Sequence, residues 1–88
     1  MDDIKYYKTL NQWTFSYEYE FYRVTNNKVV EEYYSDKGWS SPVEKCQFKR
    51  KVGRKRARLI TNLNDMYSVE QVIELVEIKE IEVFVELL

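Results

Sequence analysis

The chain is short, rich in aromatic residues and almost neutral overall, and these properties limit what it can be. It has 88 residues, a net charge of −1 and 16% aromatic residues, but only two Gly and one Pro. A chain of this length forms one domain with one modest core, and its composition is not that of a disordered segment. It has no histidine and one cysteine, which excludes an ordinary structural zinc site and removes the commonest general base.

The same features favour an intracellular protein without a cofactor. The first residues lack the basic and apolar regions of a signal peptide, and no segment has the length of a transmembrane helix. Cys46 is the only cysteine, so an internal disulfide is impossible, as is usual in a reducing compartment. We therefore predict a cytoplasmic protein that binds no metal or cofactor, has no small-molecule substrate and does not act at a membrane.

The N-terminal half predicts antiparallel strands. Segment 4–10 is a candidate short strand. Segment 12–24 is the clearest strand, because every second position carries an aromatic residue that would face the core. These aromatic residues are Trp13, Phe15, Tyr17, Tyr19 and Phe21. The Asn26-Asn27 pair tolerates positive φ and predicts a tight hairpin to a return strand at 28–35.

A second turn follows, and then the pattern weakens. Asp36-Lys37-Gly38 predicts the turn, and Trp39 begins a short extended piece that Pro42 confines to an edge or a loop. Segments 45–52 and 54–61 alternate weakly on either side of Gly53 and predict another hairpin. Residues 62–65 are expected to form a loop.

The C-terminal segment predicts one helix and one strand. Ser68 and Gln71 have the spacing of a capping box. The apolar residues that follow recur at helical spacing, which predicts a helix over 68–77. They are Val69, Val72, Ile73 and Val76. Alternation of apolar residues with glutamates then predicts a strand over 79–87. The expected fold is α+β, with an antiparallel sheet of about five strands and the helix at about 68–77 packed on it.

The strongest functional candidate is a basic segment hidden by the overall charge. Residues 45–58 carry eight basic and no acidic residues, whereas 1–44 have a net charge of −3 and 59–88 of −6. The basic residues are Lys45, Lys49, Arg50, Lys51, Arg54, Lys55, Arg56 and Arg58. A hairpin with this surface is able to track a phosphate backbone or to bind an acidic protein patch. Tyr33, Tyr34 and Trp39 are candidate aromatic contacts, on unpaired bases or in a protein interface.

An internal role for the same charges competes with this interpretation. Strand 54–61 would show Arg54, Arg56 and Arg58 on one face, and strand 79–87 would show Glu80, Glu82 and Glu86. If these strands paired, cross-strand ion pairs would neutralise part of the basic surface. Eight basic residues outnumber three glutamates, so some positive surface is expected to remain.

No catalytic motif emerges, so we predict a non-enzymatic protein. Glu77 and Lys79, with Asp65 upstream, have the E-x-K spacing of magnesium-dependent nucleases, but a chain rich in Glu and Lys shows it by chance.

The bias toward Lys, Glu, Tyr and Asn resembles, in style and through no specific motif, the small proteins of phages and mobile elements. Some of those, such as anti-CRISPR and host-takeover proteins, block host machinery. The predicted function is therefore a protein-interaction module, an inhibitor of that kind, which binds a protein or a protein–nucleic acid complex. The alternative is a nucleic-acid-binding domain that uses residues 45–58.

Overall fold

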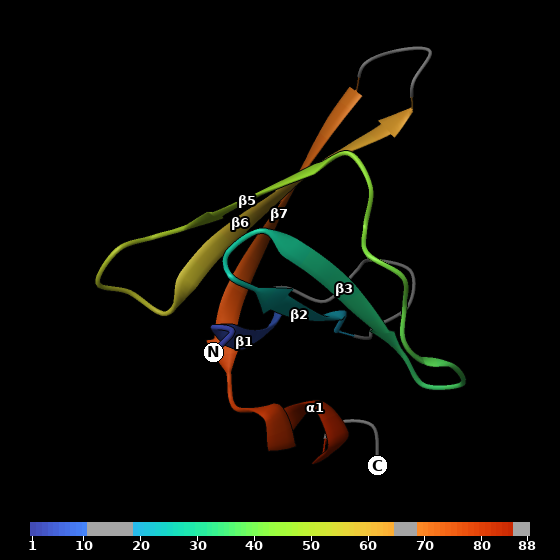
Figure 1. The fold of residues 1–88 in the computed structure, drawn as a ribbon. Coiled ribbons are helices and arrows are strands. Elements are labelled where there is room, and N and C mark those ends of the chain that lie inside the picture. Colours follow the sequence, from blue (N-terminus) through green and yellow to red (C-terminus); the bar gives the residue numbers. More distant parts are fainter. Residues whose placement is uncertain (11–18, 65–68, 86–88) are drawn as a thin grey trace.

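The computed structural model describes residues 1–10, 19–64 and 69–85, which form one curled antiparallel sheet and a short helix (Figure 1). The sheet has seven strands in the order β4-β3-β2-β1-β7-β6-β5. The elements are β1 (Ile4–Thr9), β2 (Phe21–Thr25), β3 (Val29–Tyr34), β4 (Gly38–Trp39), β5 (Cys46–Arg50), β6 (Arg56–Asn64), β7 (Val69–Ile78) and α1 (Glu80–Val85). The predicted α+β arrangement with about five strands is therefore wrong, because the protein is mostly β and its helix lies elsewhere.

The predicted turns of the N-terminal half are confirmed. Asn26 and Asn27 have φ values of 54° and 55°, the positive φ that asparagine tolerates. Lys28 N–H donates to Thr25 O at 3.1 Å, and β2 pairs with β3 through this turn. Gly38, at φ 75°, ends the turn between β3 and β4. Of the predicted strand 12–24, the structure describes β2, whereas residues 11–18 lie outside the described part of the chain.

The predicted helix over 68–77 is wrong, because most of this segment is strand β7. β7 lies between β1 and β6 and hydrogen-bonds to both, so its backbone groups are satisfied without helical bonds. Its side chains alternate: Ile73 and Leu75 are buried, whereas Val72 is 52% exposed. The β-branched residues that fitted helical spacing also favour a strand. The predicted loop at 62–65 likewise gives way to β6, which continues to Asn64 with a register shift after Asn62.

The predicted strand over 79–87 is wrong as well, because residues 80–85 form helix α1. The Lys79 N–H donates to Glu82 Oε2 at 2.7 Å, and the Glu82 N–H donates to Lys79 O at 2.9 Å. The Glu82 carboxylate therefore acts as the glutamate of a capping box. Glu80 and Glu82 lie in the first turn, where negative charge stabilises a helix. Residues 86–88 lie outside the described part.

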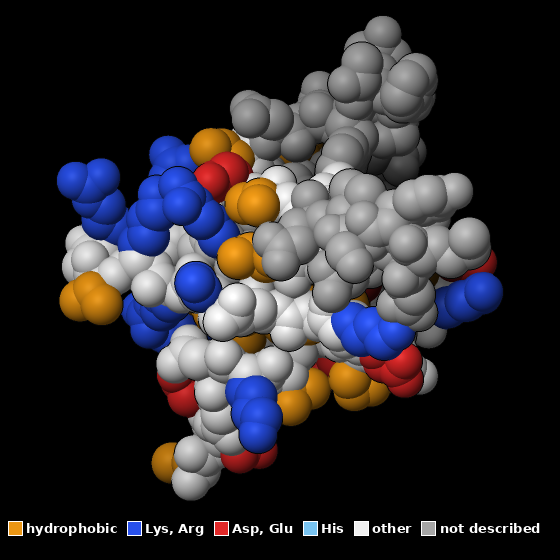
Figure 2. All heavy atoms as spheres, turned by 90° about the horizontal axis from the view of Figure 1, so that it is seen from above, with side chains coloured by type: hydrophobic (Ala, Val, Ile, Leu, Met, Phe, Trp, Pro, Cys, Tyr) orange, Lys and Arg blue, Asp and Glu red, His pale blue; other side chains and the backbone are white. Residues whose placement is uncertain are grey.

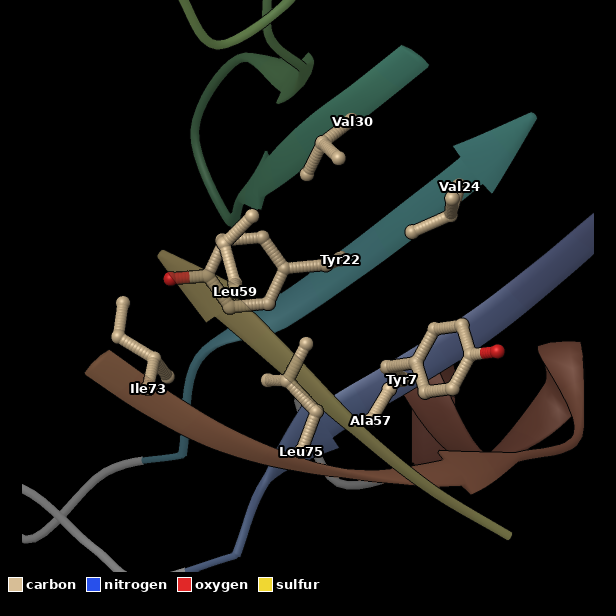
Figure 3. Packing of buried hydrophobic residues seen from close by; sticks show 8 residues of the cluster. All are labelled: Tyr7, Tyr22, Val24, Val30, Ala57, Leu59, Ile73 and Leu75. Atoms are coloured by element: carbon tan, nitrogen blue, oxygen red, sulfur yellow. The ribbon is translucent and has the colours of Figure 1, made fainter. Parts of the chain in front are cut away.

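The core lies inside the curl of the sheet. Figure 3 shows side chains of β1, β2 and β3 pointing toward those of β6 and β7. The cluster consists of Tyr7, Tyr22, Val24, Val30, Ala57, Leu59, Ile73 and Leu75. Phe48 of β5 packs against this cluster, and the Val43 N–H donates to Val30 O at 2.7 Å. The curl thus brings the β5–β6 pair over β2 and β3, although they are distant in strand order.

A second, smaller cluster lies beneath α1, on the face of strands β1, β2, β3 and β4 that points away from the main core. The Trp39 ring is 5.8 Å from the Tyr6 ring and 5.1 Å from the Tyr33 ring, and the Arg23 guanidinium lies 4.6 Å from the Trp39 ring centroid. Phe84 of α1 meets the Tyr33 ring edge-on at 5.7 Å. These contacts hold the helix against the sheet.

Candidate functional site

The structure confirms the predicted basic hairpin and exposes it. β5 and β6 pair antiparallel, with Lys49 opposite Arg58 and Arg50 opposite Ala57, and residues 51–55 connect them. All eight basic residues are exposed. Figure 2 shows Lys and Arg side chains gathered on the left, where Figure 1 places the β5–β6 turn. The hairpin is therefore a positively charged end of the molecule.

Glutamates of β7 neutralise two of the eight. The Arg58 Nε donates to Glu74 Oε1 at 2.7 Å, directly across the β6–β7 pair. An Arg50 terminal nitrogen lies 3.7 Å from Glu77 Oε1, which also lies 3.8 Å from Lys5 Nζ. Internal pairing therefore exists with β7; among the described residues it does not involve Glu80 or Glu82, and Glu86 lies outside the described part of the chain. The β7 partners were missed because residues 68–77 were expected to be helical.

Five of the remaining six basic residues, all except Lys45, are available to a partner. Among the described residues, none of these five forms an ion pair. We call them the hairpin cations: Lys49, Lys51, Arg54, Lys55 and Arg56. Five like charges within eight residues repel one another and produce a local positive potential, which an anionic partner would relieve.

The apex of the hairpin is apolar. Val52 is 98% exposed, and Gly53 beside it has a φ of 75°. The Lys51 N–H donates to Arg56 O at 2.9 Å, which closes the turn at its base. The turn thus exposes an apolar side chain, Val52, to solvent among the hairpin cations. Sequence reasoning passed over Val52, although its place next to Gly53 between basic residues marked it as a turn residue.

The predicted aromatic contacts do not join the basic hairpin. Tyr33 and Trp39 belong to the cluster beneath α1 and are half-buried. Tyr34 is 44% exposed, and its hydroxyl donates to Glu32 Oε2 at 2.9 Å. The turn after β3 lies at the right in Figure 1 and the β5–β6 turn at the left. The three aromatic residues therefore lie on β3 and β4 and not on the hairpin.

Glu20, which precedes β2, and Glu32 of β3 each accept a hydrogen bond from a tyrosine hydroxyl. The Tyr22 hydroxyl donates to Glu20 Oε2 at 2.6 Å, and burial raises the pKa of this tyrosine. Burial also raises the pKa of Glu32 above its ordinary 4.5; the hydrogen bond from Tyr34 opposes this shift, and Glu20 adds to it. Glu32 is therefore destabilised in its charged form.

The pH dependence of stability should show this effect. The folded state binds the Glu32 proton more tightly than the unfolded state, so this group's contribution to stability falls as pH rises from 4.5 through the folded pKa. We expect Glu32→Gln to remove that fall and to stabilise the protein at neutral pH. Urea denaturation from about pH 4 to about pH 8 measures it. Exposed Glu44→Gln is the control, and equal pH profiles for wild type and Glu32→Gln would contradict the assignment.

The E-x-K pattern and the single thiol are the remaining chemical groups named from the sequence. Glu77 of the E-x-K pattern faces Lys5 and Arg50, and Asp65 lies outside the described residues. Within residues 1–10, 19–64 and 69–85, no three acidic or cysteine side chains form a group suited to a metal ion. Burial raises the pKa of the Cys46 thiol, which donates to Val43 O at 3.3 Å, so the thiolate is disfavoured.

A polar hollow of about 270 Å³ lies beside the base of the hairpin. Its lining consists of Lys8, Lys55, Val76, Glu77, Ile78, Lys79 and Glu82. Three lysines and two glutamates line it together, so it does not select an anionic or a cationic small molecule by charge.

Comparison with protein families, curated proteins and solved structures gives no match. In the part of the chain that the structure describes, no helix has the length and apolar character needed to cross a membrane.

Proposed function

We propose that the protein is a non-enzymatic interaction module that contacts an anionic macromolecular partner with the β5–β6 hairpin. The observation that supports this most is the availability of five hairpin cations while Arg50 and Arg58 are paired with β7. A domain that needed positive charge only for its own stability would not keep five cations without an ion pair among the described residues at one end, because their mutual repulsion costs stability.

The partner in this proposal is a protein or a protein–nucleic acid complex with a negative surface, or, as the alternative, nucleic acid bound by residues 45–58. Inhibition of host machinery by occupying such a surface, in the manner of phage and mobile-element proteins, is part of the proposal. A cytoplasmic location also belongs to it and is supported by the free thiol of Cys46. Binding that depends on these charges would associate rapidly and weaken with salt.

A pair of matched variants tests the proposal. Lys51→Gln/Lys55→Gln removes two hairpin cations, whereas Lys28→Gln/Lys37→Gln removes two exposed lysines from turns elsewhere. The probes are labelled polyglutamate, which represents an acidic protein surface, and labelled mixed-sequence duplex DNA. We expect wild type to bind at least one probe at low salt, and the hairpin variant to bind it about tenfold more weakly.

The control variant is expected to retain wild-type affinity, although its net charge equals that of the hairpin variant. Equal losses in both variants would mean that only net charge matters, and the proposal would then be wrong. Failure of wild type to bind either probe at low salt would also overturn it.

A further inference from the structure

We propose that the surface bound by the hairpin is a groove of duplex DNA, with Val52 at the floor of the groove. This inference rests on the proposed function, because it names the partner of the same hairpin. It follows from three features of the tip: the distribution of its charges, its apolar apex and its two-stranded shape.

The available positive charge of the tip lies on the outer side of the hairpin and in its turn. Residues alternate between the two faces of a strand, so Lys49 and Arg50 project to opposite sides of β5. Arg50 shares its side with the core and with Glu77, and Lys49 shares the outer side with Arg56. The other three hairpin cations lie in the connecting turn 51–55. A tip inserted into a DNA groove brings the cations of the turn and those of the outer side close to the phosphates that border the groove.

The apex is suited to the floor of such a groove. Val52 is 98% exposed, and an apolar side chain contributes nothing to phosphate contact. The major groove of B-form DNA admits a two-stranded β-ribbon, and its floor carries the thymine methyl group, which apolar side chains contact. With cations against the walls and valine at the floor, each exposed group of the tip has a partner.

The same geometry distinguishes DNA from double-stranded RNA. The major groove of A-form RNA is deep and narrow, so side chains do not reach its base edges. We therefore expect the hairpin to prefer a DNA duplex to an RNA duplex of the same sequence. The aromatic residue of the hairpin, Phe48, packs against Tyr7 and the core, with ring centroids 5.2 Å apart, so a preference for single strands by base stacking is not expected.

The experiment measures the affinity of the full chain for four probes over a series of salt concentrations. The probes are an A·T-rich DNA duplex, the same duplex with uracil in place of thymine, the matching RNA duplex, and polyglutamate. Wild type is compared with Val52→Ser and with Lys51→Gln/Lys55→Gln. Because Val52 is almost fully exposed, Val52→Ser is expected to keep the wild-type melting temperature.

The two variants should lose affinity for DNA in different ways. Val52→Ser is expected to bind the thymine duplex about three- to tenfold more weakly with an unchanged salt slope, because it loses only apolar contact. It should no longer distinguish thymine from uracil, whereas wild type should. The lysine variant is expected to lower the salt slope by about 2, one for each lost phosphate contact.

Each other outcome overturns the inference. Equal or tighter binding of RNA, or a Val52→Ser variant with wild-type affinity and thymine preference, would exclude insertion into the DNA major groove. Binding of polyglutamate without binding of DNA would also overturn it but leave the proposed function in place. If no probe binds at low salt, both proposals fail.

Discussion

Replacing Leu75 with alanine is expected to lower the free energy of unfolding by about 2–5 kcal/mol, the range measured for buried leucines. Leu75 is fully buried on β7, the strand between β1 and β6, and belongs to the main core cluster. At roughly 0.05–0.15 kcal/mol per residue, a domain of this size has a total stability of about 4–13 kcal/mol. The variant should therefore be unfolded in part or in full at low urea concentration.

Val72→Ala is the matched control for this prediction. Val72 lies three residues before Leu75 on the same strand, but on the outer face, where it is 52% exposed. We expect Val72→Ala to cost less than about 1 kcal/mol, through weaker strand preference. In a helix over 68–77, Val72 would face the core and Leu75 would not. A larger loss at Val72 than at Leu75 would therefore contradict the strand assignment of β7.

Replacing Trp39 with alanine is expected to cost about 2–4 kcal/mol, near the lower end of the range for large aromatic residues because Trp39 is half-buried. Its ring contacts Tyr6 and Tyr33 and lies against the Arg23 guanidinium, which is itself held by Glu31 through bonds of 2.8 and 3.0 Å. Without the indole, the cluster beneath α1 loses its centre. Thermal and urea denaturation measure the loss.

The same variant separates a structural role for Trp39 from a role in binding. Trp39→Phe, which keeps an aromatic ring, is expected to recover at least half of the lost stability. At a temperature where Trp39→Ala remains folded, its affinity for duplex DNA and polyglutamate should equal that of wild type, since Trp39 and its ring partners belong to β1, β3 and β4 and not to the β5–β6 hairpin. Wild-type stability combined with lost binding would instead place Trp39 in the contact surface.

Local chemistry explains the elements that were predictable from sequence. The Asn26-Asn27 turn and the turn before Gly38 follow from the tolerance of asparagine and glycine for positive φ. The basic hairpin around Gly53 followed from a break between two alternating segments, and its concentration of charge was evident from residues 45–58. Each of these features depends on a few adjacent residues, so no distant contact was needed to predict them.

The C-terminal third was mispredicted because distant contacts decide its structure. Val69, Val72, Ile73 and Val76 satisfy helical spacing, but β-branched residues suit a strand equally well, and a short apolar pattern does not separate the two. Residues 69–78 form a strand because they pair with β1 on one side and with β6 on the other. Once β7 is placed, the glutamate cap at Lys79 and contact with Tyr33 favour a helix over 80–85.

The candidate site divides in the same way. The amino-acid sequence alone shows that one segment carries eight basic residues, that the chain has no histidine and that it has a single cysteine. Which of those basic residues are available to a partner depends on the tertiary structure. The position of β7 pairs Arg50 and Arg58 with glutamates, the packing of α1 takes Tyr33 and Trp39 into a cluster, and the turn leaves Val52 bare. Charge content is a property of composition, whereas charge availability depends on which strands become neighbours, and that is set by burial of the core.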